Sequence, residues 1–249
     1  MMDIQKIYLR QAQLFLNSSL FALIPASVFV ISIIVVIPGK NFMVLVLPFL
    51  IYSLFLFQNY LLNYKRYLSL SNKIEKVAPS LPDLLSCQQV LLYFDKEEKA
   101  LVFLHPNGAF LGMLSEKKHS FSINKGNMLH PKEFVLIDSN ENILATYWKS
   151  ETIDVHRSDK GYFGGFSNGF FSMITGEEIG ELRSKKLFLD EQVKNGQGEV
   201  LLRVRKGWMP ITNQKIFLNP NTPYVTINPA LSDPEKLIFI SLLVKKFFK

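Results

Sequence analysis

The chain has 249 residues, of which 48% are hydrophobic and 20% charged, and this apolar share is more than a soluble domain with so many charges needs. The formal net charge of +7 is spread along the sequence rather than gathered in one run, which argues against a nucleic-acid partner. A single cysteine, Cys87, excludes an intramolecular disulfide framework and a cysteine-based zinc site.

The first predicted element is a membrane-spanning helix at about residues 18–37. No charged side chain occurs between Arg10 and Lys40, and the stretch from Leu20 to Ile37 is almost wholly apolar. Because a helix rises ~1.5 Å per residue and the hydrocarbon layer is ~30 Å thick, this segment can cross a bilayer. A cleaved signal peptide fits less well, since the apolar region is too long and a second one follows at once.

A second predicted span, about residues 42–63, follows a turn at Pro38–Asn41 and ends just before Lys65 and Arg66. The turn is too short to hold a folded domain, so the two helices should form an antiparallel hairpin. Aromatic and basic residues at the end of a span are typical of the membrane interface. The expected interface anchors are Arg10, Tyr60, Tyr64, Lys65 and Arg66.

The distribution of basic residues predicts the orientation of the hairpin. Lysines and arginines flank both spans on the side of the termini, whereas the turn holds only Lys40. The positive-inside rule then places both termini in the cytoplasm and makes the protein a two-span protein of the cell membrane. The anionic cytoplasmic leaflet also accounts for the positive net charge.

A linker separates the hairpin from a cytoplasmic domain. Pro79 and Pro82 should stop a short continuation of the second helix. We therefore predict a hairpin at residues 1–66, a juxtamembrane helix and linker at 67–85, and a domain with its own core at 86–249.

The predicted cytoplasmic domain contains a series of short strands. An Asn-Gly turn at His105–Gly108 joins two apolar runs, the pattern of a β-hairpin, and the plan recurs within residues 133–148 and 172–188. Residues 199–211 alternate apolar and basic side chains, as a half-buried strand does, and residues 224–227 close the series. About ten to twelve strands without intervening helices favour an antiparallel barrel or sandwich.

A final helix begins near Ser232. Ser232 and Glu235 form a capping box, and Pro234 suits the first helical turn. Residues 237–244 are apolar around the whole circumference, yet they are too short to cross a membrane. A helix without a polar face must be enclosed on all sides, which a closed sheet can do. The alternative is an interfacial helix, which requires a polar stripe that residues 237–244 lack.

The ending SDPEKLIFISLLV and the strand series from Gln88 to Ile227 resemble the tubby-like C-terminal domain family, which includes phospholipid scramblase and LURP-one relatives. The resemblance implies a twelve-stranded antiparallel barrel threaded by a hydrophobic C-terminal helix. It also implies phosphoinositide binding or another action at membranes, although no phosphoinositide-binding set of basic residues matches. The two-span hairpin departs from the family, and bacterial proteins with a pleckstrin-homology-like barrel behind such a hairpin are the rival resemblance.

The sequence contains no motif of catalytic or metal chemistry. The histidines have no partners at metal-ligand spacing, and Asp154 with His156 is best explained as a solvated strand face. The stretch from Gly161 to Phe171 is rich in glycines and aromatics, which we expect to serve bends and core rather than a phosphate loop or an exposed lipid-contacting loop. We therefore expect no enzyme, no cofactor and no metal.

Basic residues form the candidate binding site. If two clusters share one face of the barrel, they can hold anionic headgroups or a protein partner. These residues are Arg183, Lys185, Lys186, Arg203, Arg205 and Lys206; a third basic group is Lys245, Lys246 and Lys249.

The expected function is a membrane-tethered module that recognises anionic lipid or a protein partner. Alternatives are scramblase-like lipid translocation and an accessory or immunity protein.

Overall fold

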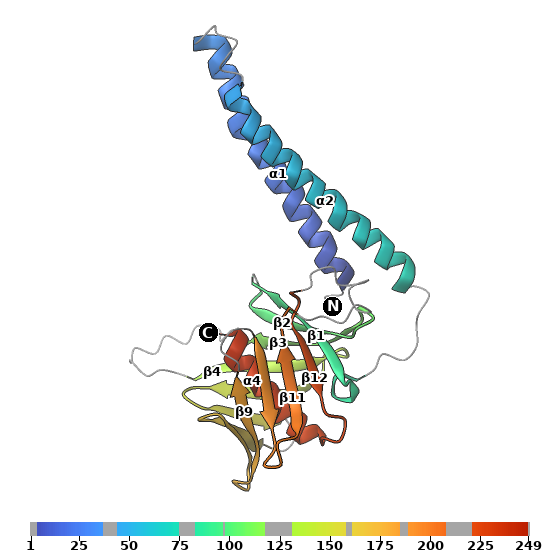
Figure 1. Ribbon diagram of the computed structural model, residues 1–249, viewed down its shortest axis with the longest axis vertical. Helices are drawn as coiled ribbons and strands as arrows, with labels where there is room; N and C mark the ends of the chain where they lie inside the picture. The colour runs from blue at the N-terminus through green and yellow to red at the C-terminus, as the bar shows by residue number, and fades with distance from the viewer. Residues whose placement is uncertain are drawn as a thin grey trace. The chain divides into compact units, whose positions relative to one another are not determined.

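The computed structural model describes residues 4–36, 44–74, 83–96, 98–117, 131–157, 161–184, 189–207 and 221–248. The chain divides into two compact units, a pair of long helices within Met2–Pro79 and a β-barrel within Ser80–Lys249 (Figure 1). The boundaries predicted at residues 66 and 85 stay predictions, because residues 75–82 lie outside the described part of the chain.

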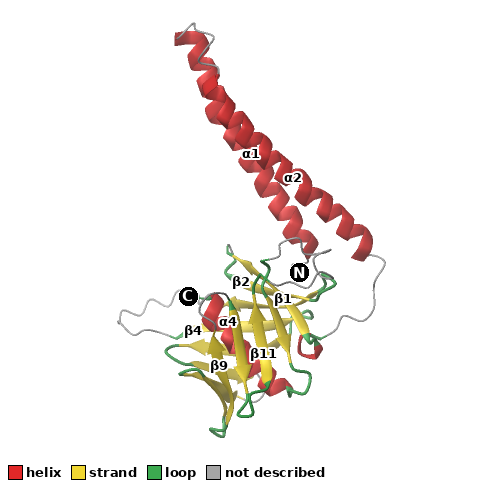
Figure 2. Cartoon of the chain, in the orientation of Figure 1, coloured by secondary structure: helices red, strands yellow, loops and turns green. Residues whose placement is uncertain are grey.

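Two helices, α1 (Ile4–Val36) and α2 (Leu47–Ile74), pack against each other along their length (Figure 2). Both are longer than the predicted spans: α1 begins well before residue 18, and α2 continues past Arg66 to Ile74. The chain therefore stays helical where its apolar stretches end. The predicted turn at Pro38–Asn41 lies outside the described residues.

The seam of the hairpin includes small residues at a spacing of seven. Ala12, Ser19 and Ala26 of α1 are buried, as are Val46, just before α2, and Ser53 of α2. The contacts of Ser19 with Ser53 and of Ala26 with Val46 make the pair antiparallel. A seven-residue repeat of small side chains lets two helix backbones approach closely, as in membrane helix pairs.

The outward surface of the hairpin is apolar. By length and composition, Gln5–Ser32 and Val44–Ser69 are each able to cross a membrane, and little of either is buried. The large exposed apolar side chains include Leu20, Phe21, Ile24, Val28, Ile31, Leu50, Ile51, Leu54 and Phe55. A continuous exposed surface of so many large apolar side chains is rare on soluble proteins and is typical of a surface that contacts lipid or another protein.

The second unit is a closed barrel of twelve strands in which each strand pairs antiparallel with the next and β1 pairs with β12. This confirms the predicted strand number and pairing. The strands are β1 (Gln89–Asp95), β2 (Ala100–Leu104), β3 (Phe110–Glu116), β4 (Lys132–Asp138), β5 (Ile143–Lys149), β6 (Ile153–Arg157), β7 (Gly161–Ser167), β8 (Phe170–Met173), β9 (Glu178–Ser184), β10 (Asp190–Lys194), β11 (Val200–Arg205) and β12 (Tyr224–Ile227). Register shifts in the pairs β2–β3, β4–β5, β6–β7, β8–β9 and β10–β11 add the curvature that closure needs.

The C-terminal helix α4 (Asp233–Phe247) fills the barrel, as Figure 2 shows and as the sequence predicted. Every residue from Lys236 to Val244 is buried, and the helix contacts strands β5 to β8. The carboxylate of Glu235 accepts hydrogen bonds from the backbone N–H and the hydroxyl of Ser232, so the capping box is confirmed. A short 3-10 turn, η2 (Leu84–Ser86), adds Leu84 and Leu85 to the same core.

The glycines of β7 were expected at bends or bulges, and the β6–β7 pair does contain a register shift, but Gly164 has a further role: it gives α4 room. A Cβ on Gly164 would lie 2.5 Å from Cδ1 of Ile238 on α4. The aromatics Phe166 and Phe171 from this glycine-rich stretch are buried in the core, whereas Tyr162 and Phe170 are exposed. The absence of a side chain at Gly164 therefore allows Ile238 of α4 to pack directly against the backbone of β7.

Candidate functional site

One end of the barrel, which we call the mouth, is the end at which α4 ends. Two contacts show which strand ends lie at the mouth. Lys149 at the end of β5 donates to the carbonyl of Phe248, and Glu191 near the start of β10 pairs with Lys246. The paired strands β4 and β11 therefore begin and end there, respectively. The register that places Asp190 opposite Arg205 puts the end of β11 at the same level. Backbone topology therefore gathers charged residues from distant parts of the sequence around the mouth.

Two lysines face each other on the inner side of the mouth. Lys132 is the direct cross-strand partner of Lys149. Their positions continue the inward-facing series of Phe134 on β4 and Tyr147 on β5, both of which are fully buried. Like charges directly opposite each other in a sheet are unfavourable.

The end of α4 adds two more cations. Nζ of Lys246 lies 2.5 Å from Oε1 of Glu191, a buried carboxylate that also accepts from the Ser184 hydroxyl. Nζ of Lys245 lies 4.4 Å from the ring centroid of Phe166, a cation–π contact. Lys246 is thus neutralised by a carboxylate, whereas Lys245 rests on an aromatic ring.

The lysines of the mouth are electrostatically strained. Burial, followed by the charges of Lys132 and Lys245, lowers the pKa of Lys149. Burial also lowers the pKa of Lys245, with Lys246 adding to the effect and Glu191 opposing it. Both lysines therefore carry their charge at a cost that a bound anion would relieve.

Four of the predicted binding residues fall in the described part of the chain, on or next to the outer face of β9 to β11. Arg183 and Arg203 lie on either side of Gln192 in one row across the sheet, so the structure brings one residue of each cluster together. Arg205 lies two residues further along β11 on the same face, and Lys206 is exposed just beyond it. Lys185 and Lys186 lie outside the described residues, as does Lys249 of the third basic group.

Carboxylates already neutralise most of this outer row. Arg203 forms a two-pronged pair with Asp190, with both N···O distances 2.7 Å, and this hydrogen bonding raises the pKa of Arg203. Nε of Arg205 lies 3.6 Å from the same carboxylate. Nη2 of Arg183 lies 2.8 Å from Oε2 of Glu181. An anion that binds this outer face must compete with Asp190 and Glu181 for the arginines. These two carboxylates form no ion pair with Lys132, Lys149 or Lys245.

The predicted interface anchors lie at one level of the hairpin. Counted from the Ser19–Ser53 contact at ~1.5 Å per residue, Arg10 is about 14 Å away along α1, and Tyr64 is about 17 Å away along α2. The aromatic side chains of α2 form a continuous series: ring centroids of neighbours in the order Phe57, Tyr60, Tyr64, Tyr67 are 5.5, 5.8 and 6.0 Å apart. Lys65 and Arg66 accompany this series, and Arg66 donates to the Asn63 side chain.

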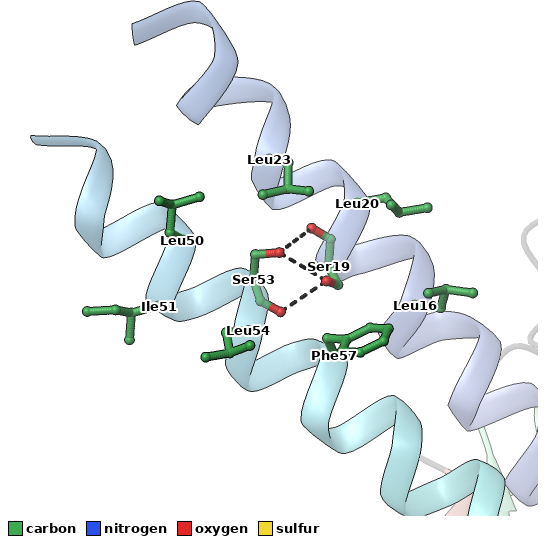
Figure 3. Close-up of a pocket in the computed structure, with 9 residues that line it drawn as sticks. All are labelled: Leu16, Ser19, Leu20, Leu23, Leu50, Ile51, Ser53, Leu54 and Phe57. Carbon is green, nitrogen blue, oxygen red and sulfur yellow. Dashed lines mark hydrogen bonds between the residues drawn. The ribbon is translucent and has the colours of Figure 1, made fainter. Parts of the chain in front are cut away.

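A groove of about 480 Å³ lies on the hairpin beside its serine pair (Figure 3). Its lining is apolar apart from Ser19 and Ser53, whose hydroxyls bond to each other and to the opposite backbone carbonyls. The other lining residues are Leu16, Leu20, Leu23, Leu50, Ile51, Leu54 and Phe57. The groove offers an apolar chain a place to lie, but no free polar group.

The described residues contain no group of three His, Cys, Asp or Glu side chains that could hold a metal ion. His156 packs between Trp148 and Tyr162, with ring centroids 6.4 and 5.5 Å away. Nδ1 of His105 accepts from the backbone of its own turn. His119 and His130 lie outside the described residues.

Sequence reasoning missed Lys132 and Lys149 as candidate site residues. They are far apart in the sequence, and neither belongs to a basic cluster. The sequence did contain one signal for Lys149. Alternation along β5 places Lys149 on the same face as Ala145 and Tyr147, which are buried, so the pattern predicts a charged side chain at an inward position near the end of the strand.

Comparison with known proteins adds a structural likeness. No family model matches the chain, and no curated protein matches it in sequence. Among solved structures, the chain is similar to the X-ray structure of a protein from Arabidopsis thaliana, with a TM-score of 0.44 and 10% sequence identity over 65% of this chain and 91% of that one.

Proposed function

We propose that this chain is a non-enzymatic, membrane-tethered binding module whose tubby-like barrel recognises anionic lipid at the cytoplasmic face of the cell membrane. The observation that carries the proposal is the gathering of Lys132, Lys149, Lys245 and Lys246 at one end of a barrel that is acidic at the other. The family assignment rests on the expected pairing of a twelve-stranded barrel with an apolar helix inside it.

The hairpin supplies the tether in this proposal. Its outward apolar side chains would be costly in water, and lipid tails satisfy them. Lys65 and Arg66 with the tyrosines beside them suit the interface, and the positive-inside rule puts that interface in the cytoplasm. Reporter domains fused at each terminus test the orientation: a fluorescent protein should fold and fluoresce at both ends, and a periplasmic or luminal phosphatase should be inactive at both.

Charge separation along the barrel supports a directed contact with an anionic surface. The described carboxylates at the end opposite the mouth are Asp138, Glu141, Glu177, Glu178, Glu199, Asp233 and Glu235. The mouth also carries carboxylates, among them Glu116 and Glu151, but Glu133, Asp190 and Glu191 each pair with a cation. An anionic leaflet therefore attracts the mouth and repels the far end, with ~1 kcal/mol per basic residue near the surface.

Lipid translocation has less support than binding. A translocation path needs polar groups facing lipid or water inside the membrane, but Ser19 and Ser53 bond to each other, and Ser27 and Ser32 bond to carbonyls of their own helix. Asn59 likewise donates to the backbone of Phe55. These side chains are satisfied within the hairpin.

Hydrogen exchange of the full chain in lipid nanodiscs tests the proposal. Amides at the mouth, in residues 131–134, 147–150 and 189–191, should exchange more slowly in discs containing phosphatidylglycerol than in discs of phosphatidylcholine alone. The added protection should fall at high salt, because screening weakens surface attraction. The far-end turn at residues 138–142 is the internal control. Equal exchange at the mouth in both lipids would overturn the proposal.

A further inference from the structure

We infer that Lys132, Lys149 and Lys245 form a binding site for a phosphomonoester group inside the mouth of the barrel. The inference rests on the proposed function, since it names the headgroup chemistry that contact with an anionic membrane would recognise. It concerns different residues from the arginine row on the outer face of β9 to β11.

The geometry brings three ammonium groups to one place. Lys132 and Lys149 are direct cross-strand partners at inward positions where β4 begins and β5 ends. Lys149 donates to the carbonyl of Phe248, which ties it to the end of α4, where Lys245 lies over the ring of Phe166. The start of β4, the end of β5 and the end of α4 thus lie together at the mouth of the barrel.

The three lysines lack a counterion in the described part of the chain. Glu191, the carboxylate nearest to the end of α4, is bonded to Lys246 and Ser184. Glu133, next to Lys132 in sequence, is 2.7 Å from Lys117. Glu116 on β3 lies opposite Phe134, on the same face as Lys132. Among the described residues, however, no carboxylate forms an ion pair with Lys132, Lys149 or Lys245, so three cations share this end with one unpaired acid position.

A phosphomonoester suits this site better than a phosphodiester. It carries between one and two negative charges at neutral pH and presents three strong acceptor oxygens, whereas a phosphodiester carries one charge. Lysine ammonium groups bind phosphate as point charges with several donors each. Phe166 and Phe248 are buried beside the lysines, whereas Lys132 and Lys245 are exposed and Lys149 is half-buried, so an anion can reach all three from solvent.

The phosphomonoester has two sources, a lipid headgroup and a soluble phosphate, and titration separates them. The full chain in neutral detergent micelles is titrated with dioctanoyl phosphatidic acid, dioctanoyl phosphatidylglycerol and inorganic phosphate, with calorimetry as the readout. We expect phosphatidic acid to bind about tenfold or more tightly than phosphatidylglycerol. Binding of inorganic phosphate with similar affinity would assign the site to soluble phosphates, and its absence would assign the site to lipid.

Variants decide whether the lysines are responsible. Lys132→Gln and Lys149→Gln should each weaken phosphatidic acid binding about tenfold to hundredfold, while Lys132→Arg should keep most of it. Lys194→Gln, on the outer face of β10 near the far end, is the matched control and should change nothing. Because Lys132 is exposed, its replacement leaves the core intact, and the thermal unfolding temperature of each variant verifies this.

The outcomes separate this inference from the proposed function. If both lipids bind equally and the lysine variants bind as the parent does, the phosphomonoester site is wrong while recognition of anionic lipid stands. If neither lipid binds the full chain and the mouth is unprotected in anionic nanodiscs, both proposals fall.

Discussion

The hydroxyl oxygens of Ser19 and Ser53 lie 3.0 Å apart across the helical hairpin. Each hydroxyl also lies 3.0 Å from the backbone carbonyl oxygen of the other serine, so the contact is reciprocal. The pair sits among leucines between α1 and α2 (Figure 3). It fixes the antiparallel register, because a helical shift of one residue would rotate either hydroxyl off the seam.

Replacing Ser19 or Ser53 by alanine should loosen the hairpin. Hydrogen bonds between membrane helices contribute about 0.6 kcal/mol on average and up to about 1.7, so each single variant should lose an amount in this range. The double variant should lose less than the sum, because both changes remove the same contact. Unfolding of the full chain in mixed micelles measures this, with Ser27→Ala as the control because Ser27 bonds only within α1. Additive losses would contradict a shared contact.

Gly164→Ala should destabilise the barrel by several kcal/mol, in the range of overpacked cores. The new Cβ would meet the carbonyl oxygen of Ser172 on β8 and Cδ1 of Ile238 on α4, and the carbonyl cannot move without breaking sheet pairing. Gly196→Ala is the matched control, since a Cβ there has open space. Thermal unfolding followed by near-ultraviolet circular dichroism reports the difference. Similar unfolding temperatures for the two variants would mean that β7 and α4 are less closely packed.

Local pattern was enough to predict the elements of the barrel. Alternation in residues 199–211 gave Leu202 and Val204 as buried and Arg203 and Arg205 as outward, which the structure confirms. The capping box and the apolar circumference of residues 237–244 predicted an enclosed helix, because burial on all sides leaves no other arrangement. These features depend on neighbours in sequence, which a single sequence contains.

The composition of the mouth could not be predicted in the same way. Which residues meet there depends on the register of twelve strands and on five register shifts, and a slip of one residue turns a side chain to the other face. Charge clusters in the sequence therefore pointed to Arg183 and Arg203, which are paired with acids, and not to Lys132 and Lys149. The predicted span also began later than α1 does, because charged and polar residues such as Lys6, Arg10 and Gln13 interrupt the apolar run before residue 18 without ending the helix.

A charge inside the barrel should unfold it. Ile240 is buried on α4 in the middle of the apolar segment. The buried cation one helical turn earlier, Lys236, is already bonded to the Leu85 carbonyl and to Asp233, so an aspartate at position 240 would have to compete for it. The expected loss for Ile240→Asp exceeds about 4 kcal/mol, whereas Ile240→Val should lose about 0.5–1.5 kcal/mol. Limited proteolysis of the full chain in micelles distinguishes the two. A protease-resistant barrel in the aspartate variant would contradict enclosure of the helix.

The stability of the barrel should rise with pH in the alkaline range because of Lys149. Burial and the neighbouring ammonium groups of Lys132 and Lys245 lower the pKa of Lys149 from its ordinary value of 10.5. The charged form is therefore disfavoured in the folded state, and this penalty is complete below the folded pKa and disappears as the pH rises toward 10.5.

Lys132→Gln should remove part of that penalty and raise the unfolding temperature at neutral pH. The gain is about 0.2–1 kcal/mol for an unfavourable cross-strand pair, and solvent screening places it at the lower end because Lys132 is exposed. Thermal unfolding at several pH values should show the advantage of the variant shrinking as Lys149 loses its proton, and Lys194→Gln should show no such trend. A gain that persists unchanged up to pH 10.5 would mean that Lys132 acts on stability through something other than the charge of Lys149. If the Lys132→Gln variant is more stable but binds phosphatidic acid more weakly, the unfavourable pair of Lys132 and Lys149 lowers stability and serves ligand binding.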